Sequence, residues 1–335
     1  MQPPDVGQIE RKTQNRVLKL FRDELKYTYL GNLEDRHGNS NIEEDIVRTY
    51  LREKGYSETL INKAMDKLRI TAFNYNESLY TNNKNVYGLL RYGVKVKADV
   101  GENYETIELI DWEHPLKNQF AVAEEVTVPG IHDKRPDIVL FVNGLPLVVI
   151  ELKNPTDENA TVKKAFTQLQ NYKQAISSLF NFNGVLVASD GLDAKAGSLT
   201  ASFSRFLAWK TVDGVKEDKT TTPQMETLIK GMLRPDVLLD LIKQFTAFQK
   251  MSSVDAQAGL TRIETVKVQA AYHQYHAVNK AVFETMRASG HTPFSLPQKE
   301  SHRFEDKKAG VVWHTQGSGK SLSMVFYAGK IVLAL

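Results

Sequence analysis

Hydrophobic positions in the first ninety residues recur every three or four places, and this spacing predicts amphipathic helices. Ile9, Val17, Leu18, Phe21 and Leu25 form the apolar stripe of the first helix. The predicted helices of this half cover residues 8–27, 41–54, 57–68 and 77–91, with Asn41 and Ser57 as N-caps. Later helices are expected over 156–179 and from Pro223 and Pro235 to about Lys250.

From Val94 the apolar positions alternate with polar ones, which predicts strands. Strands are expected over 94–100, 104–111, 120–128, 137–152 as a hairpin, 184–188 and 206–211, with a polar loop over 189–200. Strands, then a helix, then further strands predict an α/β fold in which helices flank a mixed sheet.

The most informative stretch is the hairpin around Asn143-Gly144, a dipeptide that strongly favours a tight turn between two apolar runs. A three-residue loop over 143–145 places Asp137 directly opposite Glu151. Lys153 has the same parity as Glu151, so both point to one face. Three charged side chains are therefore expected to meet at the open end of the hairpin.

Two facing carboxylates need a structural or chemical reason. At about 5 Å and an effective dielectric constant near 20 they repel by roughly 3 kcal/mol, and such pairs destabilise sheets. A divalent cation removes this repulsion, and Mg²⁺ prefers one or two carboxylates plus phosphate oxygens. With Lys153 to steady phosphate charge, Asp137 and Glu151 predict a metal-dependent phosphodiesterase site. The alternative is a solvated strand end, since Glu24-Leu25-Lys26 repeats the same triplet within a helical pattern.

Length and composition set outer limits. The 335 residues predict two domains, which we place at 1–255 and 256–335 because 251–261 is a polar boundary. A net charge of +3 is too balanced to indicate nucleic acid by itself. The chain has no cysteine, which excludes disulfides and thiolate metal sites. We expect a cytoplasmic protein, because there is no signal segment and no membrane-spanning apolar run.

A second motif follows the apolar segment 310–313. It is a glycine loop that leads into a helix, with Thr315, Gln316, Gly317, Ser318, Gly319, Lys320 and Ser321. In such loops backbone amides cradle phosphates, the lysine reaches the β- and γ-phosphates and the hydroxyl binds Mg²⁺, so ATP is the expected cofactor. His314 departs from the glycine or alanine usual at the first position. Since no second acidic cluster follows, we expect the loop to form without ATP turnover.

Three further residues are ambiguous from spacing alone. Gln168 and Tyr172 lie four apart on one helical face, where a surface glutamine and a core tyrosine are the simpler interpretation. Gln274 lies in a helical stretch upstream of the glycine loop, where a polar surface role is again simpler than adenine recognition.

Taken together, the chain resembles the restriction (motor) subunit of type I restriction-modification enzymes, the HsdR family. The resemblance spans essentially the whole chain and rests on 14–17, 29–31, 39–44, 109–112, 135–137, 151–153, Trp209-Lys210, Gln274 and 314–321. His314 is what this family shows, so the departure supports the resemblance.

The resemblance implies a restriction-endonuclease-like PD-(D/E)xK nuclease domain. Asp137 and Glu151 would bind Mg²⁺, and Lys153 would assist the attacking water. Gln168 and Tyr172 match the Gln-x-x-x-Tyr helix motif of the family, which reverses the simpler interpretation given above.

The resemblance also implies that the second domain begins a RecA-like superfamily 2 motor that translocates double-stranded DNA. Gln274 would read adenine, and Thr315 to Ser321 would bind ATP. The implied partners are the modification (methyltransferase) and specificity subunits. Two alternatives stay open: a catalytically silent DNA-docking scaffold, and an NTPase or helicase without nuclease activity.

Overall fold

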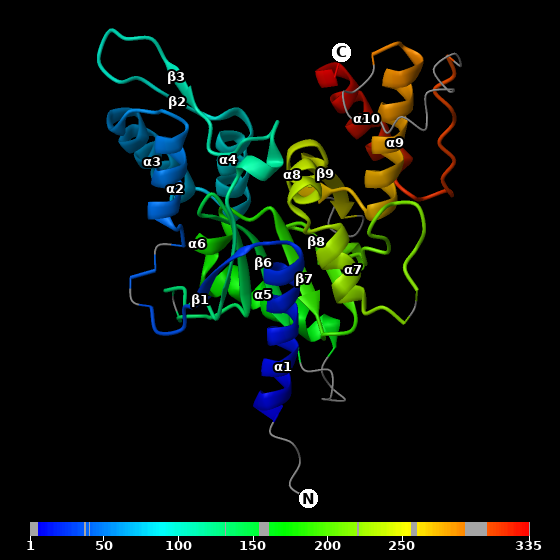
Figure 1. The fold of residues 1–335 in the computed structure, drawn as a ribbon, viewed down its shortest axis with the longest axis horizontal. Helices are drawn as coiled ribbons and strands as arrows, with labels where there is room; N and C mark the ends of the chain where they lie inside the picture. The colour runs from blue at the N-terminus through cyan, green and yellow to red at the C-terminus, as the bar shows by residue number, and fades with distance from the viewer. Residues whose placement is uncertain are drawn as a thin grey trace, which may run out of the picture.

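The computed structural model describes residues 6–36, 38–39, 41–130, 132–153, 161–219, 221–255, 260–291 and 307–334 (Figure 1). Its helices are α1 (Val6–Lys19, continued by a π-helical turn Leu20–Glu24), α2 (Glu44–Glu53), α3 (Glu58–Ala72), α4 (Leu79–Tyr92), α5 (Val162–Ala175), α6 (Ser177–Phe180), α7 (Gln224–Gly231), α8 (Pro235–Gln244), α9 (Tyr272–Ala288) and α10 (Lys320–Ala334). Its strands are β1 (Thr28–Asn32), β2 (Val94–Val96), β3 (Glu105–Ile107), β4 (Phe120–Glu124), β5 (Ile138–Val142), β6 (Leu145–Leu152), β7 (Val185–Ser189), β8 (Ala194–Gly197), β9 (Thr246–Asp255) and β10 (Leu260–Gln269).

A six-stranded mixed sheet forms the centre, in the order β1-β4-β5-β6-β7-β8. The β1–β4 and β6–β7 pairs are parallel and the other pairs are antiparallel. Both faces are covered: Leu140 and Val148 join one apolar core, and Val139 and Val149 join the other. Burial on both faces explains why β5 and β6 are almost continuously apolar. The expected α/β fold with a mixed sheet is confirmed.

The Asn143-Gly144 turn is a two-residue turn, not the expected three-residue loop. Both residues have left-handed backbones, with φ of 48° and 81°. A Cβ on Gly144 would lie 2.4 Å from the carbonyl oxygen of Glu43, so glycine is required there. A register shift between Leu140 and Phe141 then restores the pairing of Ile138 with Ile150. The expected register at the site is therefore reached by a different turn and a β-bulge.

Other element predictions differ from the structure. The N-cap of α2 is Glu43 instead of Asn41, whereas Ser57 caps α3 as expected. Leu207 makes only an isolated bridge to Ala196, so the strand expected over 206–211 is wrong, and β8 lies within the expected polar loop. Strand β1 was not expected. The long helix expected over 156–179 is α5 capped by Thr161, followed by α6; residues 154–160 lie outside the described part.

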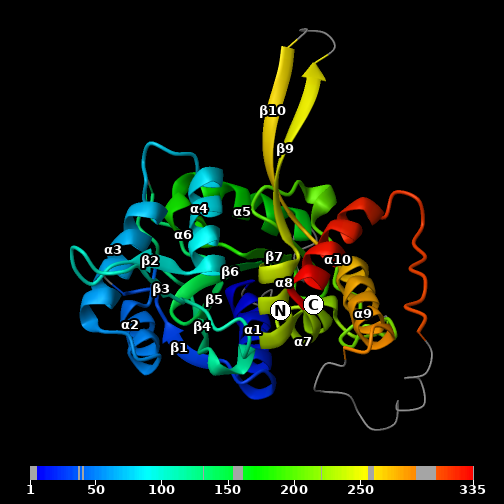
Figure 2. The same ribbon diagram turned by 90° about the horizontal axis from the view of Figure 1, so that it is seen from above.

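The stretch expected to be a polar boundary is a long hairpin. Strands β9 and β10 pair from Thr246 with Gln269 to Asp255 with Leu260, and they project from the body (Figure 2). The expected helix to Lys250 therefore ends at Gln244. At the base of the hairpin the buried Lys267 ammonium donates to the Asn83 side chain at 3.0 Å and to the Asn183 carbonyl at 2.6 Å. The division at 255/256 falls between the two strands, and it stays a prediction.

Helix α10 packs against α9 and against α8 (Figure 1). The Phe245 and Phe326 rings lie 5.4 Å apart, and Lys330 pairs with Asp240 at 2.6 Å. Residues 310–313 form no regular strand, which corrects that expectation, whereas the expected helix after the glycine loop is α10. In the described part of the chain, every helix is too short or too polar to cross a bilayer.

Candidate active site

Asp137 and Glu151 come from neighbouring strands at one edge of the central sheet. Asp137 immediately precedes β5, and Glu151 lies near the end of β6. Since Ile138 pairs with Ile150, the two acids face each other as the hairpin register requires. Glu151 is only 1% exposed, so its carboxylate lies well inside the protein.

The two carboxylates have different partners. The Lys153 ammonium donates to Glu151 Oε1 at 2.5 Å. The backbone N–H of Leu152 donates to Asp137 Oδ2 at 2.6 Å. Burial raises the pKa of Asp137 well above its usual value, and the nearby Glu151 carboxylate raises it further. The two carboxylates therefore repel each other, and a cation bound between them would offset this repulsion.

Helix α5 brings two more predicted residues to the same place. Gln168 and Tyr172 lie on the face of α5 that turns toward the acids, and the Tyr172 hydroxyl donates to the carbonyl oxygen of Arg135 at 3.1 Å. Burial raises the pKa of Tyr172, and Glu151 adds to this effect. Tyr172 is thus a neutral hydrogen-bonding group beside Glu151.

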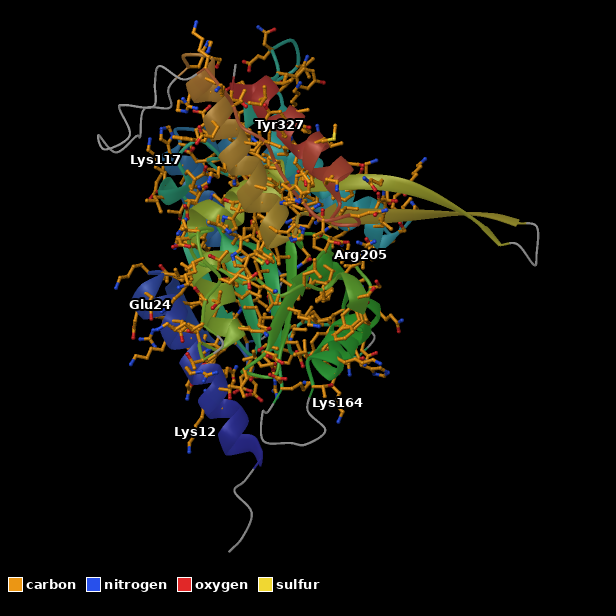
Figure 3. All side chains as sticks on the ribbon, turned by 90° about the vertical axis from the view of Figure 1, so that its right-hand side faces the viewer. Lys12, Glu24, Lys117, Lys164, Arg205 and Tyr327 are labelled. Atoms are coloured by element: carbon orange, nitrogen blue, oxygen red, sulfur yellow. The ribbon has the colours of Figure 1, made fainter. Side chains whose placement is uncertain are left out.

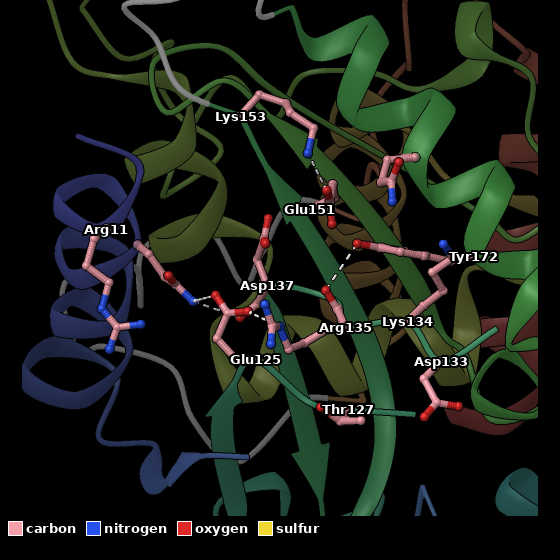
Figure 4. A pocket seen from close by; sticks show the side chains of 12 residues that line it. Arg11, Glu125, Thr127, Asp133, Lys134, Arg135, Asp137, Glu151, Lys153 and Tyr172 are labelled. Atoms are coloured by element: carbon pink, nitrogen blue, oxygen red, sulfur yellow. Dashed lines mark hydrogen bonds and ion pairs between the residues drawn. The ribbon is translucent and has the colours of Figure 1, made fainter. Parts of the chain in front are cut away.

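One cavity of about 630 Å³ joins all five predicted nuclease residues (Figure 4). Figure 4 shows Lys153 directed toward Glu151, with Asp137 close by on the adjacent strand. The lining of the cavity is mostly polar and consists of Arg11, Gln14, Glu125, Thr127, Asp133, Lys134, Arg135, Asp137, Glu151, Lys153, Gln168 and Tyr172. Four basic and four acidic side chains line it, a mixture that suits a phosphate chain together with a bound cation.

The other seven residues that line the cavity were not predicted from the sequence as parts of a site. Arg11 and Gln14 come from α1, more than a hundred positions before the acids, and only the folded chain brings them there. Glu125 has a left-handed backbone with φ of 51°, which no local pattern predicts. Arg135 was visible within the motif that precedes Asp137, and its guanidinium pairs with Glu125 at 2.9 Å.

The donor set fits a hard divalent cation. Asp137 and Glu151 offer carboxylate oxygens, which Mg²⁺ prefers, and the chain has no thiol to compete. Within the described ranges, groups of three or more His, Asp or Glu side chains placed around a common metal position are absent. Two carboxylates suffice for Mg²⁺ when water and phosphate oxygens complete its coordination shell. The arrangement therefore agrees with a metal site whose coordination is completed by the substrate.

The glycine loop lies elsewhere and shares no lining residue with this cavity. Gly317 and Gly319 have positive φ values of 81° and 79°, so the loop curls tightly before α10 begins at Lys320. The Lys320 ammonium donates to the carbonyl oxygens of His314 and Thr315 at 3.0 and 3.2 Å. The lysine is thus folded onto its own loop, where an anion would draw it away.

Gln274 lies directly beneath this loop. Its side-chain nitrogen donates to the Gly319 carbonyl at 3.0 Å, and its oxygen accepts from the Ala271 N–H at 2.9 Å. Gln274 is 5% exposed. In this arrangement it supports the loop, and adenine recognition would replace these bonds.

Comparisons with known proteins found matches both for the region that contains the cavity and for the region that contains the glycine loop. The family model described as the N terminus of the type I restriction enzyme R protein matches residues 8–205, and that of the SWI2/SNF2 ATPase matches 273–335. The chain is 41% identical over 262 residues to the type I restriction enzyme HindI endonuclease subunit of Haemophilus influenzae. It is 33% identical over 256 residues to the MjaIXP protein of Methanocaldococcus jannaschii, provisionally described as the same kind of subunit.

These alignments cover 76% and 73% of this chain but only 23% of each relative. The chain therefore spans about a quarter of the length of these relatives, and the part it matches includes the hairpin, α5 and the cavity. On this evidence the chain belongs to the endonuclease (R) subunit family of type I restriction enzymes.

Proposed function

We propose that the cavity around Asp137 and Glu151 is a Mg²⁺-dependent endonuclease site that hydrolyses DNA phosphodiester bonds, carried on a PD-(D/E)xK restriction-endonuclease-like fold. The observation that carries this proposal is the convergence of two facing carboxylates, a lysine, a glutamine and a tyrosine in one polar cavity. Burying facing carboxylates destabilises a fold that has no use for them.

The residues have distinct roles in this proposal. Asp137 and Glu151 would hold Mg²⁺, which when bound polarises the phosphate and lowers the pKa of a bound water. Lys153 steadies the negative charge that develops on the phosphate, from a position already hydrogen-bonded to Glu151. Gln168 contributes a carboxamide to the same cavity, and Tyr172 holds the main chain at Arg135, next to Asp137.

DNA would approach along the basic side chains at the cavity. Arg11 from α1 and Lys134 line it. In Figure 3, Lys12 on α1 and Lys164 on α5 both lie in the lower part of the molecule. Such side chains contact phosphates without reading sequence, so target choice would rest with the specificity subunit.

In the full-length protein we propose that cleavage is coupled to ATP-driven translocation of double-stranded DNA. Gln274 and the loop Thr315 to Ser321 would bind ATP, with modification and specificity subunits as partners in the cytoplasm. Support comes from the curled glycine loop, its junction with α10 and the match of 273–335 to an ATPase family model.

The proposal is tested by plasmid cleavage with the full-length subunit assembled with its modification and specificity subunits, in the presence of Mg²⁺ and ATP. We expect Asp137→Ala and Lys153→Ala each to lower cleavage at least about 100-fold, with ATP hydrolysis retained. Asp66→Ala and Lys117→Ala change exposed residues of the same types and serve as matched controls.

Two outcomes would contradict the proposal. If both site variants cleave like the controls, the nuclease assignment is wrong and the chain is an ATP-driven motor or helicase part. If the assembled wild-type complex binds DNA but never cleaves it, the cavity belongs to a DNA-docking scaffold.

A further inference from the structure

Helix α1 contributes a buried carboxamide to the cavity. Gln14 is only 4% exposed, and its side-chain nitrogen donates to two acceptors. One is the main-chain carbonyl oxygen of Asp137 at 3.1 Å, and the other is Glu125 Oε1 at 3.0 Å. A single side chain from the N-terminal helix thus reaches the backbone of one proposed metal ligand.

Glu125 completes this contact from the other side. Its backbone N–H also donates to the Asp137 carbonyl, at 3.0 Å. Its left-handed backbone, with φ of 51°, costs about 1–3 kcal/mol in a residue other than glycine. The conformation is held by Gln14 on one carboxylate oxygen and by Arg135 on the other, at 2.9 Å. Such over-determined strain is typical of functional sites.

The position of Asp137 explains why this support matters. Strand β5 begins at Ile138, so Asp137 lies just beyond the last recorded pair of the β5–β6 ladder, Ile138 with Ile150. Its carbonyl is held instead by Gln14 and Glu125. The main chain at Asp137 therefore depends on donors outside the ladder, while its carboxylate accepts from the Leu152 N–H of β6.

We propose that Gln14 is a positioning residue for Asp137, which makes α1 a working part of the nuclease site. The inference rests on the proposed function, since it assigns Gln14 a role through a metal-binding Asp137. Partners that orient metal ligands typically change metal affinity or activity 10–100-fold when they are lost. An ordinary packing role would instead change stability and leave the metal affinity alone.

The test is Mn²⁺ titration of this chain by isothermal calorimetry, together with thermal unfolding in EDTA. Gln14→Met keeps the length of the buried side chain and removes the donor. We expect its Mn²⁺ affinity to fall at least tenfold while it still unfolds in one cooperative transition. Asn15→Met, on the exposed side of the same helix, is the matched control and should bind within twofold of wild type.

The outcomes separate this inference from the proposed function. If wild type binds Mn²⁺, Asp137→Ala abolishes binding and Gln14→Met binds like wild type, the positioning role is overturned and the nuclease site stands. If wild type and Asp137→Ala bind Mn²⁺ with equal affinity, Asp137 is no metal ligand and both are overturned. Should Gln14→Met fail to fold, Gln14→Leu takes its place, with the same two results deciding.

Discussion

Replacing Asp137 by asparagine should stabilise the metal-free protein while it destroys the proposed activity. The substitution keeps the shape of the side chain and an oxygen that accepts from the Leu152 N–H, a bond of 2.6 Å in the structure. It removes a negative charge from a half-buried position opposite Glu151, which is itself 1% exposed. The repulsion between the two carboxylates disappears with that charge.

The magnitude follows from the hairpin geometry. Side chains directly opposite across two strands lie about 5 Å apart, and at an effective dielectric constant near 20 two unit charges repel by roughly 3 kcal/mol. The Lys153 ammonium, 2.5 Å from Glu151 Oε1, offsets part of this. We therefore expect the free energy of unfolding to rise by about 1–2 kcal/mol, which raises Tm by roughly 2–6 °C.

The pH dependence of the free energy of unfolding tests the direction of this change a second time. The pKa of Asp137 is raised in the folded state by burial and by Glu151, so the folded protein holds a proton that the unfolded chain loses above the usual pKa of 3.8. The unfolding free energy of wild type therefore falls as pH rises from about 4 through the folded pKa. The Asp137→Asn variant lacks this loss, so its advantage over wild type should grow from pH 5 to pH 8.

The assay is differential scanning calorimetry in EDTA at pH 5 and pH 8. Asp66→Asn is the matched control, because Asp66 is exposed and should change stability by less than about 0.5 kcal/mol. Adding Mg²⁺ should stabilise wild type but not the Asp137→Asn variant. An unchanged or lower Tm for Asp137→Asn at pH 8 would refute the electrostatic reasoning.

Three further predictions follow from other groups. Lys320→Ala should weaken binding of a fluorescent ATP analogue at least tenfold, because the ammonium beside the glycine loop is lost. Mn²⁺ binding at Asp137 should be unchanged in this variant. Nucleotide affinity equal to that of wild type would contradict the assignment of the loop. Burial lowers the pKa of Lys267 to about 7 from 10.5, so the unfolding free energy of wild type should rise between these pH values, by up to about 1.4 kcal/mol per unit. In urea unfolding, the free energy of unfolding of Lys267→Met should not rise between pH 7 and pH 9. If it rises as much as that of wild type, groups other than Lys267 cause the pH dependence. Gly144→Ala should lower the free energy of unfolding by more than about 1 kcal/mol, because the new Cβ meets the Glu43 carbonyl in a left-handed turn; a urea midpoint equal to wild type would contradict this.

The hairpin was predictable because its signals are local. Asn143-Gly144 and two apolar runs specify a turn and an alternation of faces, and these place Asp137 opposite Glu151. The turn length was wrong by one residue, and the bulge near Leu140 compensates for it. Since the bulge depends on packing around the whole sheet, its position is not encoded in the turn residues.

Other elements escaped prediction because their partners are distant. Strand β1 is short and partly exposed, and it exists because it pairs with β4, about ninety residues later in the chain. The β9–β10 arm begins in residues that also suit a helix end or a polar linker. Gln14 and Glu125 reached the site through contacts between α1 and the sheet, which neither spacing nor composition reveals.

The central claim is that Asp137 and Glu151 together hold a divalent cation. The most direct measurement is anomalous diffraction from a crystal of this chain soaked in Mn²⁺. The account predicts a single strong peak within coordination distance of both carboxylates, and its loss in Asp137→Asn. A soaked crystal without that peak, with Lys153 still bonded to Glu151, would contradict the account.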